Sequence, residues 1–138
     1  MKFVFYDELN KDEKMIREKV FVEEQGFENE FDDIDQTCLH LVIYKDNLPV
    51  GCARMYSQGQ EMILGRIAVL KEYRKLHLGS EILSVLESKA KELKFDTVSL
   101  SAQVRAMPFY KKNGYSEYGE EYLDEFCPHL HMKKYIAD

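Results

Sequence analysis

The chain has 138 residues, which is the size of one domain with its own hydrophobic core. Apolar residues make up 45% and charged residues 32% of it, as in soluble globular proteins, and the net charge is −6 at pH 7. Because binding to a nucleic-acid backbone needs a basic face, this acidic balance argues against a nucleic-acid partner. We therefore treat residues 1–138 as a single domain.

The cysteines and the hydropathy pattern exclude several further classes of protein. Cys38, Cys52 and Cys127 are isolated and odd in number, so neither a disulfide framework nor a metal site is expected. The first residues are charged from Asp7 onward and lack the apolar core of a signal peptide, and no stretch approaches the length of a membrane span. We expect a cytoplasmic protein with no membrane partner.

The first half of the chain predicts a strand, a helix and an antiparallel meander. Lys2–Tyr6 is the strand, and Asn10 can cap a helix that runs to about Gln25 and is ended by Gly26. The acidic segment 27–36 is irregular and is placed to close over a cleft. The meander strands are Thr37–Lys45, Val50–Tyr56 and Met62–Leu70, with a hairpin turn at Asp46–Asn47.

The second half predicts a helix–strand return and a final hairpin. The helix runs from Leu78 to about Lys94, and the strand Thr97–Gln103 then lies parallel to the last meander strand. The remaining elements are a short helix from Pro108 to Lys112 and an antiparallel pair, Tyr115–Gly119 and His129–Ile136, joined by an acidic loop. The order β α β β β α β α β β predicts an α/β protein with one mixed sheet and helices on both faces.

The stretch from Gly65 to Leu83 combines a strand, a basic turn and a helix start. A helix N-terminus carries partial positive charge, so acidic side chains are expected there. Four basic or potentially basic residues are found instead, with only one acid among them: Lys71, Arg74, Lys75 and His77, and Glu72. Gly79 lets a phosphate approach the backbone, so the stretch predicts a pyrophosphate site, although a solvated basic turn would have the same composition.

The order of elements and the sequence RIAVLKEYRKLHLGSEIL together resemble the GNAT superfamily of N-acetyltransferases over roughly residues 37–119. The family's Gln/Arg-x-x-Gly-x-Gly/Ala turn corresponds to Arg74–Gly79, with His77 where the first glycine usually stands. QVRAMPFYKKNGY, residues 103–115, is similar to the family segment that ends in a tyrosine and a Gly-aromatic pair. VFVEEQG and Pro128-His129 also resemble a narrower set of small GNAT proteins.

This resemblance implies a GNAT fold that binds acetyl-CoA as acyl donor and uses no metal. The strand residues Ile67, Ala68 and Val69 would pair their main chain with the pantetheine arm, even if their side chains are ordinary core residues. The pyrophosphate would be bound by Arg74, Lys75, His77, Leu78, Gly79 and Ser80. Gln103 and Phe109 would lie beside the pantetheine.

Tyr110 is expected to be the general acid. The resemblance puts it where the family often keeps the group that protonates the departing thiolate. The reference pKa of a phenol, about 10, exceeds that of a thiol, about 8.5, so the phenol stays protonated at neutral pH. The alternative role is that of a core aromatic beside Phe109.

The general base is less well marked. The family often places a glutamate six residues before the position of Val69, and Ile63 stands there. The candidates are Glu23, Glu24, Glu61, His40 and His129, each of which could also be a surface charge or a structural histidine. We favour Glu24 because it lies at a helix end that faces the presumed acceptor cleft.

The acceptor is expected to be a primary amine of a small molecule or an exposed amine. Arg54, Arg66 and His129 are assigned to it, and the two arginines could meet a carboxylate or could pair with the Asp32–Asp35 cluster. The acidic segments 28–35 and 120–125 favour a cationic acceptor. The sequence leaves open the identity of the amine, the acyl length and a homodimer.

Two other functions compete with an acetyl-CoA-dependent N-acetyltransferase. A non-catalytic CoA-binding sensor is supported by the missing glutamate at Ile63. REKVFVEEQGF and FDDID are faintly similar to acyl-homoserine lactone synthases, which typically lack the pyrophosphate turn. Because Arg74–Ser80 is present, the lactone synthase ranks below the other two.

Overall fold

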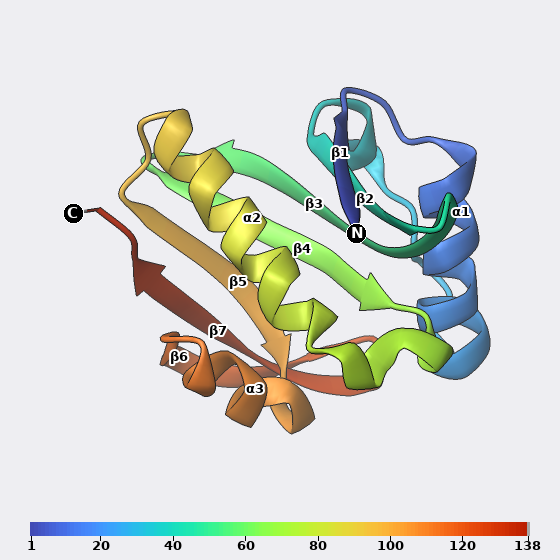
Figure 1. Cartoon of the computed structure of the whole chain (residues 1–138). Helices are drawn as coiled ribbons and strands as arrows, with labels where there is room; N and C mark the ends of the chain where they lie inside the picture. The colour runs from blue at the N-terminus through green and yellow to red at the C-terminus, as the bar shows by residue number, and fades with distance from the viewer. Residues whose placement is uncertain (138) are drawn as a thin grey trace.

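The structure is a computed structural model that describes residues 1–137. Its centre is a seven-stranded mixed sheet in the order β1-β2-β3-β4-β5-β7-β6 (Figure 1). The strands are β1 (Lys2–Tyr6), β2 (Leu39–Lys45), β3 (Leu48–Gln58), β4 (Glu61–Val69), β5 (Thr97–Gln103), β6 (Ser116–Asp124) and β7 (Cys127–Tyr135). The helices are α1 (Lys11–Arg17), α2 (Leu78–Glu92) and α3 (Met107–Lys112), with short helical segments η1 (Glu18–Glu24), η2 (Asp33–Gln36), η3 (Lys71–Leu76) and η4 (Val104–Ala106).

The predicted order of elements and the mixed sheet are confirmed. Strands β1 to β4 form an antiparallel meander, and β4 pairs with β5 in parallel after the α2 crossover. Asp46 and Asn47, between β2 and β3, both have positive φ (53° and 67°), which matches the twist of a two-residue hairpin.

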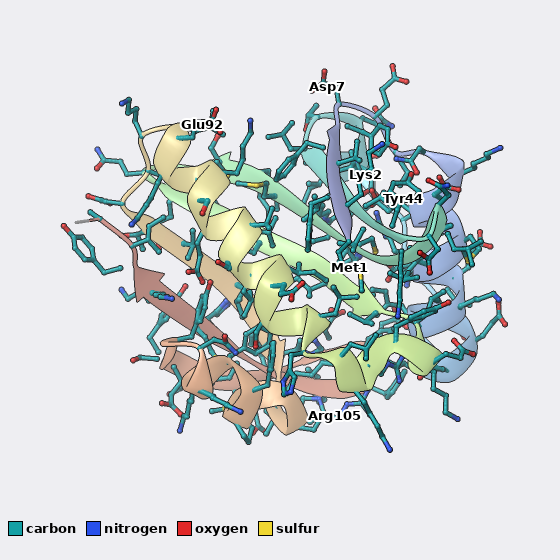
Figure 2. The ribbon with its side chains drawn as sticks, in the orientation of Figure 1. Met1, Lys2, Asp7, Tyr44, Glu92 and Arg105 are labelled. Atoms are coloured by element: carbon teal, nitrogen blue, oxygen red, sulfur yellow. The ribbon has the colours of Figure 1, made fainter. Side chains whose placement is uncertain are left out.

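Helices cover both faces of the sheet, as predicted, because the strands alternate their apolar side chains. Leu41 and Ile43 of β2 belong to the larger core cluster, which packs under the α2 residues Ile82 and Leu86 (Figures 1 and 2). Val42, on the opposite face, lies in a second cluster with Ile16 and Val20 of the N-terminal helix. The period of two in β2 thus assigns one face to each helix.

One predicted helix is partly of another type, and one predicted loop was wrong. The expected helix from Asn10 to Gln25 is capped by Asn10, whose side chain accepts from the backbone N–H of Glu13, but only α1 is α-helical and η1 continues as a π-helix. The expected acidic loop 120–128 is largely strand, because β6 runs to Asp124 and β7 begins at Cys127. The register shifts between Tyr118 and Tyr122, and the pairing with β7 resumes from Tyr122 to Asp124.

The two parallel strands β4 and β5 pair over only three residues. Met62–Leu64 of β4 pair with Val98–Leu100 of β5, and no further pairing joins the two strands within residues 1–137. Each strand nevertheless keeps its outer partner, since β4 stays paired to β3 up to Val69 and β5 stays paired to β7 up to Gln103. The strands therefore separate, and the inner edge of β4 from Gly65 onward is left without a neighbouring strand.

A bulge in β4 lies where the separation begins. The register with β3 shifts between Cys52 and Arg54, and the facing residue Arg66 has a φ of 50°. This left-handed conformation is rare for a residue with a Cβ, and such bulges redirect side chains.

The acidic segment 27–36 does not lie over a cleft as an open loop, because its carboxylates are bound by arginines from three elements. Arg17 of α1 donates to Glu30 (2.8 Å) and Asp35 (2.7 Å). Arg54 of β3 donates to Asp32 and Asp35 (2.7 and 3.0 Å). Burial alone would raise the pKa of Asp35, but hydrogen bonds from Arg17 and from the Asp32 backbone lower it to about 2.

His40 completes this buried cluster as an imidazolium. Its Nδ1 is 3.0 Å from the Glu13 carboxylate and its Nε2 is 2.9 Å from the Asp35 carbonyl oxygen. Both partners can only accept, so both ring nitrogens carry a proton. Burial alone would lower the pKa of His40, but its bonds with the Cys38 thiol, Glu13 and the Asp35 carbonyl raise it to about 10.

Within residues 1–137 no helix is both long and apolar enough to span a membrane. The expected cytoplasmic location stays a prediction.

The first prediction concerns the pH dependence of stability. A pKa raised from 6.5 to about 10 makes a contribution that is complete below about pH 6.5 and is lost as the pH rises through 10. We expect the difference in unfolding free energy between the wild type and His40→Gln to shrink between pH 7 and 10, measured by urea unfolding. His131→Gln, which removes an exposed histidine, serves as control, and parallel wild-type and His40→Gln curves would contradict the imidazolium.

Candidate functional site

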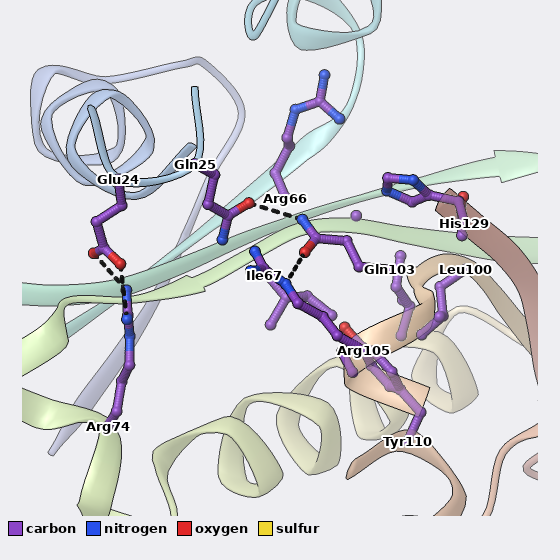
Figure 3. A pocket seen from close by; sticks show the side chains of 14 residues that line it. Glu24, Gln25, Arg66, Ile67, Arg74, Leu100, Gln103, Arg105, Tyr110 and His129 are labelled. Atoms are coloured by element: carbon purple, nitrogen blue, oxygen red, sulfur yellow. Dashed lines mark hydrogen bonds and ion pairs between the residues drawn. The ribbon is translucent and has the colours of Figure 1, made fainter. Parts of the chain in front are cut away.

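A cavity of about 380 Å³ fills the gap between β4 and β5 (Figure 3). Seven residues predicted for the site line it: Glu24, Arg66, Ile67, Arg74, Gln103, Tyr110 and His129. Sequence reasoning missed Gln25 and Arg105, which also line it. Both adjoin residues that were assigned, Glu24 in VFVEEQG and Gln103 in QVRAMPFY, so their place in these segments was the available signal.

The inner edge of β4 forms one wall of the cavity. Ile67 and Val69 pack against the larger core cluster, whereas Ala68 points to the opposite face and is buried in the second cluster. The free hydrogen-bonding edge of the strand is a template on which an extended ligand can add as a further strand.

The strand leads directly into η3 and the N-terminus of α2. The predicted basic turn is a 3₁₀ helix, and Lys75 and His77 are exposed at its end. His77 caps α2 with a φ of 57°, a conformation for which glycine is the usual residue. Leu78 is buried, and the first N–H groups of the helix, those of Leu78, Gly79 and Ser80, lack intrahelical partners by position.

Gly79 has a packing role that the sequence did not reveal. A Cβ at this position would lie 3.0 Å from Cζ of the Phe109 ring, closer than side-chain carbons pack. The ring of Phe109 in turn makes an edge contact with Tyr110, with ring centroids 5.1 Å apart. Gly79 therefore lets α3 approach the N-terminus of α2.

Tyr110 is the expected general acid, and its surroundings suit a phenol that keeps its proton. Burial raises the pKa of Tyr110 to about 12. Its ring packs edge-on against Tyr115, and its hydroxyl has no hydrogen-bond partner in residues 1–137. An unpartnered hydroxyl beside a cavity is available to a ligand.

Glu24 and Arg74, assigned separately to the base and the pyrophosphate, are paired with each other. Two hydrogen bonds of 2.6 and 2.9 Å join the Arg74 guanidinium to the Glu24 carboxylate, and Arg74 Nε also donates to the Val69 carbonyl. The hydrogen bond from Arg74 lowers the pKa of Glu24. This pairing argues against Glu24 as the base and turns Arg74 away from the end of α2.

His129, unlike Glu24, has a side-chain atom that is free to accept a proton in the cavity. Its Nδ1 lies 2.9 Å from the Cys127 carbonyl oxygen, which can only accept, so Nδ1 carries the proton. The side chain is buried between the rings of Phe27 and Tyr122, and it extends from β7 toward Arg66 (Figure 3). Nε2 has no partner within residues 1–137, so the neutral ring presents a proton acceptor to the cavity.

The two arginines assigned to the acceptor lie differently. Arg54 is buried, binds Asp32 and Asp35, and does not line the cavity, so the alternative pairing with the acidic cluster is the one observed. Arg66 lines the cavity, but its guanidinium is held by Glu30 at 2.8 Å through the carbonyl and 2.9 Å through the carboxylate. The assignment of Arg54 is therefore withdrawn.

A chain of hydrogen bonds crosses the cavity from η1 to η4. Gln103 Nε2 donates to Gln25 Oε1, and Arg105 Nε donates to Gln103 Oε1, each at 2.8 Å (Figure 3). The end of η1 is thereby connected to the end of β5.

Comparison with known proteins agrees with this geometry. Residues 7–136 match the sequence profile of the acetyltransferase (GNAT) domain. A Bacillus subtilis protein described as the uncharacterized N-acetyltransferase YjcF is 40% identical over 131 residues, covering 93% of this chain and 94% of that protein. The crystal structure of a candidate N-acetyltransferase from Lactobacillus plantarum has a TM-score of 0.90 and 28% identity, covering 99% of this chain and 98% of the other.

Two more distant structures share the fold. An aminoglycoside 6'-N-acetyltransferase in complex with coenzyme A has a TM-score of 0.75 and 16% identity, covering 100% of this chain and 98% of that one. The CoA-dependent acyl-homoserine lactone synthase BjaI has a TM-score of 0.80 and 16% identity, covering 92% of this chain and 75% of its own.

The contact between Gly79 and Phe109 predicts that Gly79→Ala changes the unfolding free energy in opposite directions with and without the Phe109 ring. In an open helix Gly→Ala stabilises by about 0.5–1 kcal/mol, but here the added Cβ meets the ring, and overpacking costs about 1–3 kcal/mol. We expect Gly79→Ala to lower the unfolding free energy in the wild type and to be neutral or stabilising in Phe109→Leu. Stabilisation in both backgrounds, measured by denaturant unfolding, would contradict the contact.

Proposed function

The chain belongs to the GNAT acetyltransferase family, and we propose that it transfers an acetyl group from acetyl-CoA to a primary amine by direct attack. The observation that carries this proposal is the unpaired edge of β4, which ends at a helix N-terminus surrounded by basic residues. An edge of this kind can pair with an extended pantetheine arm while the helix end binds its phosphates.

The phosphate end is assigned to the start of α2. Leu78, Gly79 and Ser80 offer backbone N–H groups, and Lys75 and His77 add charge or hydrogen bonds beside them. Gln103, on the opposite strand, can meet the amide groups of the arm, and Phe109 supports the helix end through Gly79.

His129 and Tyr110 divide the proton transfers between them. Acetyl-CoA supplies an activated thioester. His129 Nε2 takes the proton that the attacking amine gives up as its nitrogen forms the C–N bond, and a backbone N–H near Val69 stabilises the oxyanion. Tyr110 donates its proton to the thiolate sulfur as the C–S bond breaks, and solvent restores it.

Two alternatives keep specific support. Ile63 in place of a glutamate and the pairing of Glu24 with Arg74 agree with a CoA-binding sensor without turnover. The fold likeness to BjaI agrees with a lactone synthase, which would form lactone from S-adenosylmethionine. Because BjaI is itself CoA-dependent, the helix N-terminus suits either enzyme, and an assay for lactone formed from S-adenosylmethionine separates them.

A charge placed at the start of α2 tests the donor site. Ser80→Glu suits a helix N-terminus, so the variant should fold, yet it puts a carboxylate where the pyrophosphate would bind. We expect calorimetry to give an acetyl-CoA Kd about 10-fold or more weaker for Ser80→Glu and within about 3-fold of wild type for Ser80→Gln. No binding by the wild type would reject both the transferase and the sensor.

The proposed proton carriers are tested together with an amine panel. We expect Tyr110→Phe and His129→Gln each to lower kcat by about 100-fold while the acetyl-CoA Kd stays unchanged. Unchanged kcat in either variant refutes its role, and binding without turnover of any amine favours the sensor.

A further inference from the structure

A second cavity, of about 320 Å³, adjoins the first on the side of the β6–β7 turn. Glu24, Gln25 and Arg105 line both cavities, and Phe126, Cys127 and Pro128 complete the second. Phe126 stacks on Phe27 with ring centroids 5.1 Å apart, which gives the second cavity an apolar wall. A donor that pairs with β4 in the first cavity would leave the second to the acceptor.

Arg105 differs from every other arginine of the chain. Arg17, Arg54, Arg66 and Arg74 are each ion-paired with at least one carboxylate. Arg105 has no carboxylate partner in residues 1–137 and lies at the same end of the sheet as η3 and α3 (Figure 2). A guanidinium is charged at all relevant pH values, and this exposed one acts on Glu24 through space without forming an ion pair in residues 1–137.

The hydrogen-bond chain orients this guanidinium. Arg105 donates only its Nε, to Gln103, which is itself held by Gln25. Its two terminal amino groups have no partner within the described part of the chain. They form the planar fork that binds a carboxylate through two parallel hydrogen bonds.

The acidic segments do not compete for this fork. Asp32 and Asp35 are bound by Arg17 and Arg54, which line neither cavity, and Glu30 is bound by Arg17 and by Arg66. Glu125 accepts from the backbone N–H groups of Glu28 and Asn29. Glu24 is the one acid that lines either cavity, and Arg74 holds it. The guanidinium of Arg105, where the two cavities meet, therefore favours an anionic group on the acceptor. This is contrary to the cationic acceptor that the acidic segments suggested.

We propose that Arg105 binds a carboxylate of the acceptor, so that the acceptors are primary amines that also carry a carboxylate. This inference rests on the proposed acetyl transfer. It adds a specificity-determining residue that does not contact the reacting atoms.

Matched amines that differ in one group test this proposal. The amino acids other than proline and cysteine, and their primary amides, are assayed with acetyl-CoA by release of free thiol. We expect kcat/KM to be about 10-fold or more higher for accepted acids than for their amides. Arg105→Gln should lower kcat/KM for the acids by about 10- to 100-fold, chiefly through KM, and leave the amides unchanged. Arg105→Lys should fall between the two.

Lys112→Gln is the matched control, because it removes one exposed positive charge from the neighbouring helix α3 and lines neither cavity. Amides used as well as acids, or no turnover of any acid while acetyl-CoA still binds, would overturn the inference. So would a weakened acetyl-CoA Kd in Arg105→Gln, which would assign the fork to the donor. Failure of the wild type to bind acetyl-CoA would instead remove the proposed function itself.

Discussion

The separation of β4 from β5 is the constraint on which the rest of the structure depends. Two parallel strands that pair over three residues and then part can persist only because each keeps a partner on its outer side. The gap determines where the cavity lies. It also determines which segments border the cavity, namely η3, which follows β4, and η4, which follows β5. The unpaired strand edge is the surface on which the proposed donor would add as a further strand.

The buried cluster of arginines, carboxylates and His40 attaches α1 and the segment 27–36 to strands β2, β3 and β4. Burying ions carries a desolvation cost, which is offset only when every charge is paired and hydrogen-bonded. Here carboxylates from α1 and the 27–36 segment meet arginines from α1, β3 and β4, and His40 supplies a further positive charge from β2. The cluster joins elements that also share the apolar contacts of the second core cluster, and it pairs their carboxylates with arginines.

Periodicity sufficed for the fold because strand alternation and the helix stripe are local properties. The sequence correctly predicted the order of the elements, the Asp46–Asn47 turn and the Asn10 cap. The site was harder to predict because its pairings join distant residues, as Arg74 and Glu24 lie 50 positions apart. Neither the pairing nor the reason for Gly79 can be read from composition. The second part of β6, after Gly119, was missed because its acidic residues have low strand propensity.

The contact between Gly79 and Phe109 has a consequence for the length of ligand that fits. Phe109 touches the start of α2, and the next residue in the chain, Tyr110, presents its hydroxyl beside the cavity. Under the proposed function, the ring of Phe109 therefore fixes the distance between the phosphate site and the thioester site. The pantetheine arm must then span this distance. A donor with a shorter or longer arm could not place its phosphates at the start of α2 and its thioester beside Tyr110 at the same time.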